Sequence, residues 1–426
     1  MDGRPDSANS GSTTRVIAYV ASPLHILSAL AAIETVHASR HPRVTVVVNY
    51  PTGDAKLLDE LHDIASVMTR GLPLVESCIA VSNEGLDHLT GRTDVEAAAK
   101  EFRNLVSLGT FSEVYYFHDV MGQFFPMLAQ SYPNARRICY GDVLGTTLER
   151  QYHLSQLGIE VAASVVTADP AVMPSLWRRI GSVLTKPWTA KPQIADLSKL
   201  PFGLCSTLPH SASLILPVDE SGEFLANIPW QVVSKKLVLR LLNELVSRCS
   251  AFREYEDRLL AGRETADKFL LMTECNAEAQ FLTFEHDIDM YCAIIEHHCS
   301  PRSTIFLKPH PAERVRRYDA IRARLGDRYE LIEFDPRFRR YPIEFAARLA
   351  RECTPISMSY PSVSLLYLYG VNVIQPMSKA FIEKWYAPKY WEFLRRSRAM
   401  MDEPRKRLAT WDGRSLLWSG RQGLLQ

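Results

Sequence analysis

The chain has 426 residues, of which 46% are hydrophobic and 23% are charged, and its formal net charge is +1. This length predicts two domains, each with its own hydrophobic core. The near-neutral charge excludes a general polyanion binder, so we expect no nucleic-acid partner and only local anion sites. Residues 1–14 are polar and lack the apolar stretch of a signal peptide, which predicts a disordered tail. No run approaches the ~20 apolar residues that span a bilayer, so we expect a cytoplasmic protein.

From Arg15 onward, short apolar runs alternate with segments of helical periodicity. They predict strands at 15–21, 43–50, 76–82, 113–119 and 135–142, and helices at 23–38, 54–70, 94–109 and 124–133. Strands that alternate with helices form parallel sheets with right-handed crossovers. The first part of the chain therefore predicts a parallel α/β lobe.

Residues 165–225 lose this rhythm and are rich in Pro, Lys and Ser, which predicts a long connection that contains the lobe boundary. The second series predicts strands at 212–218, 267–274, 303–311, 329–334, 354–359 and 371–376, and helices at 233–262, 284–299, 313–326, 342–352 and 362–370. The predicted domains are a tail at 1–14, an N-terminal lobe with the linker at 15–210, a C-terminal lobe at 211–385 and a helical segment at 386–426.

The predicted fold is an α/β protein of two Rossmann-like lobes whose parallel sheets face a central cleft. Ligands of such sheets bind beyond the carboxyl ends of the strands. The eight cysteines show no CxxC pair and no zinc-ligand spacing. We therefore expect free thiols, no metal and no cofactor.

The segment IFLKPHP carries the clearest candidate site. An apolar strand delivers Lys308 and His310 to its carboxyl end, and two prolines stiffen the turn that follows. Lysine supplies a point charge and histidine supplies N–H donors for phosphate oxygens. A surface lysine with a structural histidine is the competing interpretation, and the strand-end position favours a phosphate site.

A second candidate is the segment SMSYPSVSLL, where a strand leads into a helix through Pro361. Ser359, Ser362 and Ser364 crowd this turn. A helix N-terminus with free N–H groups and hydroxyls can bind phosphate. Simple capping by one of these serines is the alternative, and the two roles are compatible.

A third candidate is Asp142, which follows Gly141 at the end of a buried strand. A carboxylate beside a glycine at a strand end can approach a ligand closely and remove a proton from it. An Asx-turn aspartate is the structural alternative.

Other polar side chains are predicted at strand ends or helix starts. Ser22 and His25 lie on the first strand-to-helix turn, where an acceptor site and a cap with a packed histidine fit equally well. Glu344 follows Pro342 in an early helical turn, where it could hold ribose hydroxyls or complement the helix dipole. Thr273 and Glu274 end a strand of the second lobe and are expected to line the cleft.

Two groups of basic residues favour solvated helix faces. One group comprises the arginines at positions 314, 316, 317, 322 and 324. The other is the segment FLRRSRAMMDEPRKR, for which a peripheral contact with an anionic membrane is the alternative.

These motifs, in this order, resemble the bacterial sialyltransferases of the GT-B fold, particularly the capsular polysialyltransferase-like group. The segments that carry the resemblance are SPLHILSALAAIE, YGDVLG, LKPHP and SYPSVSLLYLYG. The likeness extends from about residue 15 to residue 385, and only LKPHP is close to verbatim.

The resemblance implies an inverting, metal-independent transfer of a sialic acid-type sugar from CMP to a glycan or glycolipid in surface-polysaccharide synthesis. It implies that Asp142 is the base and that His310 and Lys308 stabilise the leaving phosphate. It also implies that Ser362 and Ser364 bind this phosphate and, by a looser likeness, that Glu344 contacts cytidine or ribose. The expected location is the cytoplasm, including the inner face of the plasma membrane.

The family's acidic pair before a glycine is absent, because the chain has Gly141-Asp142-Val143 with a single carboxylate. A transferase that uses CMP-activated Kdo, another ulosonic sugar, is therefore an alternative. Two further alternatives are another GT-B enzyme, such as a UDP-sugar transferase or a 2-epimerase, and a catalytically silent glycan-binding subunit.

Overall fold

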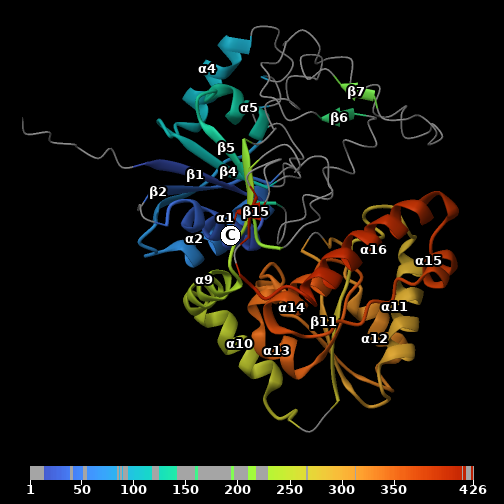
Figure 1. Ribbon diagram of the computed structural model, residues 1–426. Helices are drawn as coiled ribbons and strands as arrows, with labels where there is room; N and C mark the ends of the chain where they lie inside the picture. The colour runs from blue at the N-terminus through green and yellow to red at the C-terminus, as the bar shows by residue number, and fades with distance from the viewer. Residues whose placement is uncertain are drawn as a thin grey trace, which may run out of the picture.

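The computed structural model describes residues 14–38, 42–50, 55–83, 86, 89, 95–117, 124–141, 159–161, 193–195, 210–216, 229–264, 267–311, 313–414, 416–418 and 424–425. These residues form two α/β lobes, the first above the second in Figure 1. Each lobe has its own mainly parallel sheet with helices packed against it. The predicted fold class, α/β with two Rossmann-like lobes and parallel sheets as in GT-B proteins, is confirmed.

The sheet of the first lobe has the strand order β15-β14-β9-β8-β5-β4-β1-β2-β3 in the described part of the chain. The strands are β1 (Arg15–Val20), β2 (Arg43–Val48), β3 (Val75–Ala80), β4 (Glu113–Tyr116), β5 (Arg136–Cys139), β8 (Ser211–Leu214), β9 (Trp230–Val232), β14 (Leu416–Trp418) and β15 (Leu424–Leu425). All pairs from β3 to β9 are parallel, whereas β14 and β15 are antiparallel. The central strands are nearly continuous Val, Ile and Tyr runs because both faces of a parallel sheet are buried.

Helices cover this sheet. They are α1 (Pro23–Val36), α2 (Ala55–Thr69), α4 (Val95–Val106) and α5 (Phe124–Ser131). Helix α1 is apolar on nearly every side, which is typical of a fully enclosed helix, and it contacts β1, β8, α2 and α9. Ser22 caps it by accepting a hydrogen bond from the backbone N–H of His25. A separate pair of short strands is formed by β6 (Ile159–Val161) and β7 (Gln193–Ala195).

The sheet of the second lobe has the order β12-β11-β10-β13 among the described residues, and all three pairs are parallel. Its strands are β10 (Lys268–Met272), β11 (Thr304–Lys308), β12 (Glu330–Glu333) and β13 (Thr354–Ile356). Its helices are α11 (Phe284–His298), α12 (Tyr318–Leu325), η3 (Pro336–Phe338), η4 (Ile343–Phe345), α13 (Ala347–Glu352), α14 (Pro361–Tyr369), α15 (Lys379–Trp385) and α16 (Pro388–Leu408).

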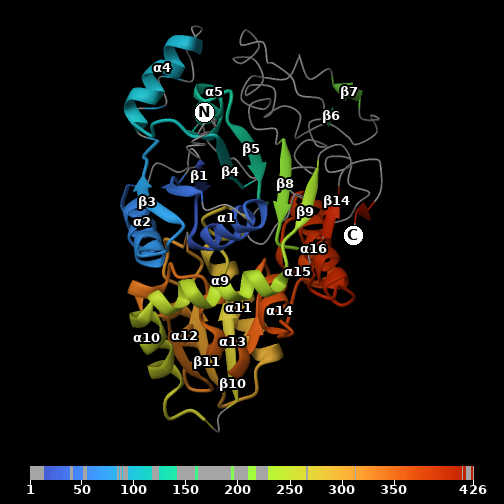
Figure 2. The same ribbon diagram turned by 60° about the vertical axis from the view of Figure 1, so that its left-hand side comes forward.

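Helices α9 (Lys235–Arg248) and α10 (Ser250–Leu260) lead from one lobe to the other, as Figure 2 shows. Helix α9 packs on α1 and α2 of the first lobe. The predicted single helix over 233–262 is divided at Cys249, whose backbone is not helical.

The predicted lobe boundary at residue 210/211 and the purely helical end at 386–426 both differ from the structure. Strand β8 pairs with β5, so Ser211–Leu214 belongs to the first sheet. After α16 the chain returns to the first lobe, where β14 pairs with β9. The physical reason is the same in both cases, because an edge strand is stabilised by any neighbour that supplies backbone partners, however far away it lies in the sequence.

Two predicted helices of the second lobe are shorter than their periodic patterns. Helix α12 begins at Tyr318, because residues 313–317 form a loop around the buried Arg317. The predicted helix at 342–352 is split into η4 and α13 by Ala346, which lies outside the helical region. No helix in the described part of the chain is both long enough and apolar enough to cross a membrane.

Candidate active site

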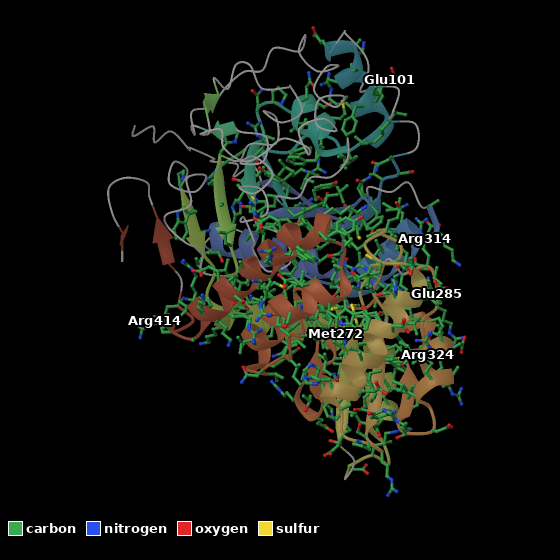
Figure 3. All side chains as sticks on the ribbon, turned by 90° about the vertical axis from the view of Figure 1, so that its right-hand side faces the viewer. Glu101, Met272, Glu285, Arg314, Arg324 and Arg414 are labelled. Atoms are coloured by element: carbon green, nitrogen blue, oxygen red, sulfur yellow. The ribbon has the colours of Figure 1, made fainter. Side chains whose placement is uncertain are left out.

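The carboxyl ends of β10, β11 and β13 meet at one edge of the second sheet, on the side of the first lobe. Strand β10 has β11 on one side and β13 on the other, so the order of the strands reverses between β10 and β13. Ligands of open α/β sheets bind at such a reversal. Figure 3 labels Met272, the last residue of β10, in the part of the lower lobe that lies toward the upper lobe.

The loop after β11 is tied directly to the end of β10. The hydroxyl of Thr273 accepts a hydrogen bond from the backbone N–H of His310, with an N to Oγ1 distance of 3.3 Å. The same hydroxyl donates to Glu313 Oε2 at 2.7 Å, and Thr273 N–H donates to the carbonyl of Lys308 at 3.0 Å. The predicted neighbours Thr273, Lys308 and His310 therefore come together, and Thr273 serves as a support of the loop.

His310 is half-buried beside other positive charges. Burial, followed by the charge of Lys308, lowers the pKa of His310 to about 4. Near neutral pH the imidazole is therefore uncharged and can donate one hydrogen bond from its single N–H group. In this state it would act on a ligand oxygen as a dipole, and the formal positive charge would have to come from other groups.

Lys308 is buried below the loop that follows β12. Its Nζ donates to the carbonyl of Arg339 at 2.5 Å and to its neighbour's carbonyl, Pro309 O, at 3.4 Å. Burial is the main cause that lowers the pKa of Lys308 to about 7, and the carboxylate of Glu344 partly opposes this effect. An amine with this pKa can gain a proton when an anion arrives.

Glu344 lies in the same buried region. Its side chain is 4% exposed, and Oε1 accepts a hydrogen bond from Ser364 Oγ at 2.5 Å. Burial raises the pKa of Glu344, while the hydrogen bond from Ser364 and the charge of Lys308 lower it. The side chain of Tyr369 also bonds to the backbone carbonyl of Glu344.

The three predicted serines at the start of α14 differ in burial and in the groups that they contact. Ser362 and Ser364 are both buried, and Ser362 Oγ lies 3.7 Å from Met401 Sδ. Their hydroxyls thus contact protein groups, with Ser364 committed to Glu344. Ser359 is half-buried in the turn before the helix, where its backbone N–H donates to Ser357 Oγ. Of the three predicted serines, Ser359 is the one that lies beside the end of β10, through its contact with Glu274.

Glu274 follows β10 at the reversal of strand order. Its Oε1 atom is buried and has no hydrogen-bond partner among the residues that the structure describes. Burial raises the pKa of Glu274 to about 7, partly opposed by a hydrogen bond from Ser359, and the charge of Asp287 adds to the rise. A buried oxygen without a partner costs about 1–3 kcal/mol, which makes it a natural point of attachment for a ligand donor.

Arg317 supports this edge of the sheet and was wrongly predicted to lie on a solvated helix face. Its side chain is 1% exposed. The guanidinium donates to Asp287 Oδ2 at 2.7 Å and to Glu278 Oε2 at 2.6 Å, and NH1 lies 3.1 Å from Glu313 Oε2. Burial tends to raise the pKa of Glu278, but hydrogen bonds from Arg317 and from backbone groups bring it down to about 2.

The other four arginines of the predicted group, at positions 314, 316, 322 and 324, are exposed as expected. Figure 3 shows Arg314 and Arg324 on the outer flank of the second lobe. Sequence spacing could not distinguish Arg317 from them, because the carboxylates of Glu278 and Asp287 come from a loop and a helix about 30 or more residues away.

In the first lobe, the predicted residues Ser22 and His25 lie at the start of α1, beside the end of β5. His25 is buried, its Nδ1 accepts from Ala21 N–H at 3.2 Å, and its ring packs on Phe117 with centroids 4.5 Å apart. The ring of Tyr140, just after β5, lies 6.0 Å from that of His25. Capping by Ser22 and packing of His25 are thus both present.

Asp142 lies outside the described residues, but the backbone that leads to it does not. Gly141 has a φ of +79°, in the left-handed region that favours glycine. The preceding Tyr140 is anchored by a 2.7 Å hydrogen bond from its hydroxyl to the carbonyl of Tyr19. The described backbone therefore ends at Gly141, directly after a firmly held strand end whose Tyr140 ring lies near His25.

Within the ranges that the structure describes, no group of three or more His, Cys, Asp or Glu is arranged to hold a metal ion. The seven cysteines described there are free thiols.

No family model matches this chain, and no curated protein sequence matches it. Solved structures similar to it include a UDP-GlcNAc 2-epimerase from Neisseria meningitidis bound to UDP-GlcNAc, at 11% identity over 93% of this chain and 99% of the other, with a TM-score of 0.45. A sialyltransferase from Photobacterium damselae, solved as its GT-B domain, is 10% identical over 92% and 98% of the two chains, with a TM-score of 0.42. An E. coli heptosyltransferase with ADP-2-deoxy-2-fluoro heptose is 11% identical over 84% and 87%, with a TM-score of 0.35. Similarities this distant leave the activity of the chain open.

Proposed function

We propose that this protein is an inverting glycosyltransferase that moves a sialic acid-type sugar from its CMP donor to a hydroxyl of a glycan or glycolipid. The observation that carries the proposal is the convergence of Lys308, His310, Glu274 and Ser359 at the carboxyl ends of β10, β11 and β13. Hydrogen-bond donors and an amine that can take up a proton are groups that stabilise the negative charge of a nucleoside monophosphate leaving group.

In the proposed reaction, the carboxylate of Asp142 accepts the proton of the acceptor hydroxyl as its oxygen attacks the anomeric carbon. The bond from this carbon to the phosphate oxygen breaks, and CMP leaves with the electron pair. The configuration at carbon is inverted in this single displacement. No metal takes part in these steps, because the negative charge that develops is met by side chains of the second lobe.

Lys308 and His310 would divide this work. A phosphate that approaches Lys308 stabilises the ammonium form, so the buried amine takes up a proton on binding. His310 contributes a neutral N–H donor, and preorganised donors of this kind are each worth about 3–4 kcal/mol in a transition state. Glu344 and Ser364 would contribute indirectly. The hydroxyl of Ser364 holds the carboxylate of Glu344, and the charge of this carboxylate acts on Lys308.

The roles of Ser22, His25 and Thr273 follow from their places in the fold. Ser22 and His25 form the turn beside β5 in the first lobe, so they would help to shape the acceptor side. Thr273 fixes the backbone of His310. Because the proposed acceptor is a surface glycan, we place the enzyme in the cytoplasm, with the basic helix α16 as a candidate contact to the inner face of the plasma membrane.

One observation favours a second candidate. Burial raises the pKa of Glu274 to about 7, and one of its oxygens has no partner in the described part of the chain, which are properties of an acid/base group. A nucleotide-sugar 2-epimerase needs such groups in addition to a phosphate site. A CMP-Kdo transferase is the remaining alternative, since Kdo is also an ulosonic sugar.

The test separates chemistry from folding. We expect Asp142→Asn and His310→Ala each to lower kcat for transfer from a CMP-ulosonate by about 10²-fold or more, because each removes a group that acts in the transition state. Asp142→Asn should leave CMP affinity unchanged, which titration calorimetry would measure. Thermal unfolding checks the fold of both variants, and full activity in either one contradicts the mechanism.

A further inference from the structure

Arg340 is a buried cation whose hydrogen bonds are incomplete. It lies in the loop between η3 and η4 of the second lobe, and its side chain is 10% exposed. Its Nε donates to Glu60 Oε2 of α2, in the first lobe, at 2.9 Å. Its NH1 atom is buried and has no hydrogen-bond partner among the described residues. A buried donor in this state costs about 1–3 kcal/mol, and more when it is charged.

This partly paired guanidinium lies near the candidate phosphate site. The charge of Arg340 is one of the causes that lower the pKa of both Lys308 and His310, which places it close to the ends of β11. The backbone carbonyl of the preceding residue, Arg339, accepts the hydrogen bond from Lys308 Nζ. Arg340 is thus part of the same cationic cluster, on the side that contacts the first lobe.

The position of Arg340 between the lobes limits which group of a ligand its NH1 atom can bind. In a transfer reaction the nucleotide is held by one lobe and the acceptor by the other, so the transferred sugar must lie between them. The planar guanidinium group of an arginine matches the two oxygens of a carboxylate. A neutral hexose offers no such group, whereas every ulosonic sugar carries a carboxylate beside its anomeric carbon.

We propose that Arg340 binds the carboxylate of the donor sugar and so selects an acidic ulosonic sugar over a neutral one. This assignment rests on the proposed function and deepens it. Glu60 holds Nε and so orients the guanidinium, and NH1, which has no partner among the described residues, would bind the carboxylate. Phosphate is the competing anion, and the experiment below distinguishes the two.

The test compares CMP, which has only the phosphate, with CMP-Neu5Ac and CMP-Kdo, which have phosphate and carboxylate. We expect Arg340→Gln to raise the Kd and KM of both donors at least about tenfold while leaving the Kd of CMP within about twofold. Arg340→Lys keeps the charge without the fork and should recover only part of the loss. Arg337→Gln is the matched control, because Arg337 lies three residues earlier, in η3, and its side chain is 74% exposed and paired with Asp335.

The other possible results of this comparison each contradict a specific claim. An equal loss for CMP and for the two donors would assign Arg340 to the phosphate and overturn the carboxylate assignment. Unchanged donor affinity in Arg340→Gln would overturn it while leaving the proposed function intact. If the parent protein binds no CMP, the proposed function fails and the assignment falls with it. Thermal unfolding of each variant confirms that the comparison is between folded proteins.

Discussion

Lys308 is the residue at which burial and charge conflict most directly. The lysine is 4% exposed, and its Nζ donates hydrogen bonds to the backbone carbonyls of Pro309 and Arg339. Burial disfavours the ammonium form and lowers the pKa to about 7. A buried ammonium group lowers the free energy of unfolding, and a role in phosphate binding would explain why a lysine occupies this position.

The conflict predicts a dependence of stability on pH. Between about pH 7 and pH 10, the unfolded chain holds a proton on Lys308 that the folded protein has released. The contribution of Lys308 to the free energy of unfolding therefore increases as pH rises through this range. The slope is up to about 1.4 kcal/mol per pH unit for one proton. Below pH 7 both states are protonated, and the full penalty is present.

We therefore expect Lys308→Met to be more stable relative to the parent at pH 6.5 than at pH 8.5, measured as the free energy of unfolding in urea. Methionine keeps the length of the side chain and removes the charge. Arg316→Met, at a position 59% exposed, is the control and should show no such change with pH. A difference between parent and Lys308→Met that is the same at both pH values would show that the amine is not penalised by burial.

At the scale of elements, the loops after β10 and β11 are held together by Arg317. It binds Glu278 from the first loop, Glu313 from the second and Asp287 from α11. Glu313 in turn accepts from Thr273, which holds His310 N–H. The chain of contacts runs from a buried ion cluster to the backbone of the candidate catalytic histidine.

Removing Arg317 should therefore be costly. We expect Arg317→Met to lower the free energy of unfolding by about 3–5 kcal/mol, because three carboxylates lose their shared cation. Arg316→Met should cost under about 1 kcal/mol, since the ion pairs of Arg316 are exposed. Urea unfolding measures both, and hydrogen exchange should show faster exchange of His310 N–H in the first variant alone. Equal costs for the two variants would show that the buried cluster does not stabilise the loops.

The elements themselves were largely predictable from sequence, because period and length identify a buried strand or a helix. The strand that ends at Lys308 and the helix after Pro361 are examples. The predictions that failed concern residues whose partners lie far away in the sequence. Pairing assigns Ser211–Leu214 to the first sheet, and the distant carboxylates bury Arg317.

The candidate site was predictable in its position but less so in its orientations. Strand ends placed Lys308, His310, Thr273 and Glu274 correctly at one edge of the sheet. Sequence alone could not show that Ser364 turns inward to Glu344, because this depends on how α14 packs. The pairing of Arg340 with Glu60 is likewise set by the contact between lobes.

At the scale of the whole molecule, the described part of the chain crosses from the first lobe to the second and back again. It passes to the second lobe through α9 and α10, and it returns after α16 to add β14 and β15 to the first sheet (Figure 1). Salt bridges add to the contact between lobes, as between Arg340 and Glu60. The donor and acceptor sides that we propose thus belong to two connected bodies that can hold a sugar between them.

The central claim is that the second lobe binds a CMP-activated acidic sugar. The most direct measurement is the release of nucleotide from CMP-Neu5Ac, CMP-Kdo, UDP-GlcNAc and an ADP-heptose, each incubated with the protein and a panel of surface glycans. We predict acceptor-dependent release of CMP from a CMP-ulosonate and no turnover of the UDP or ADP sugars. Conversion of UDP-GlcNAc to its 2-epimer, or acceptor-dependent release of UDP, with no release of CMP, would contradict this account.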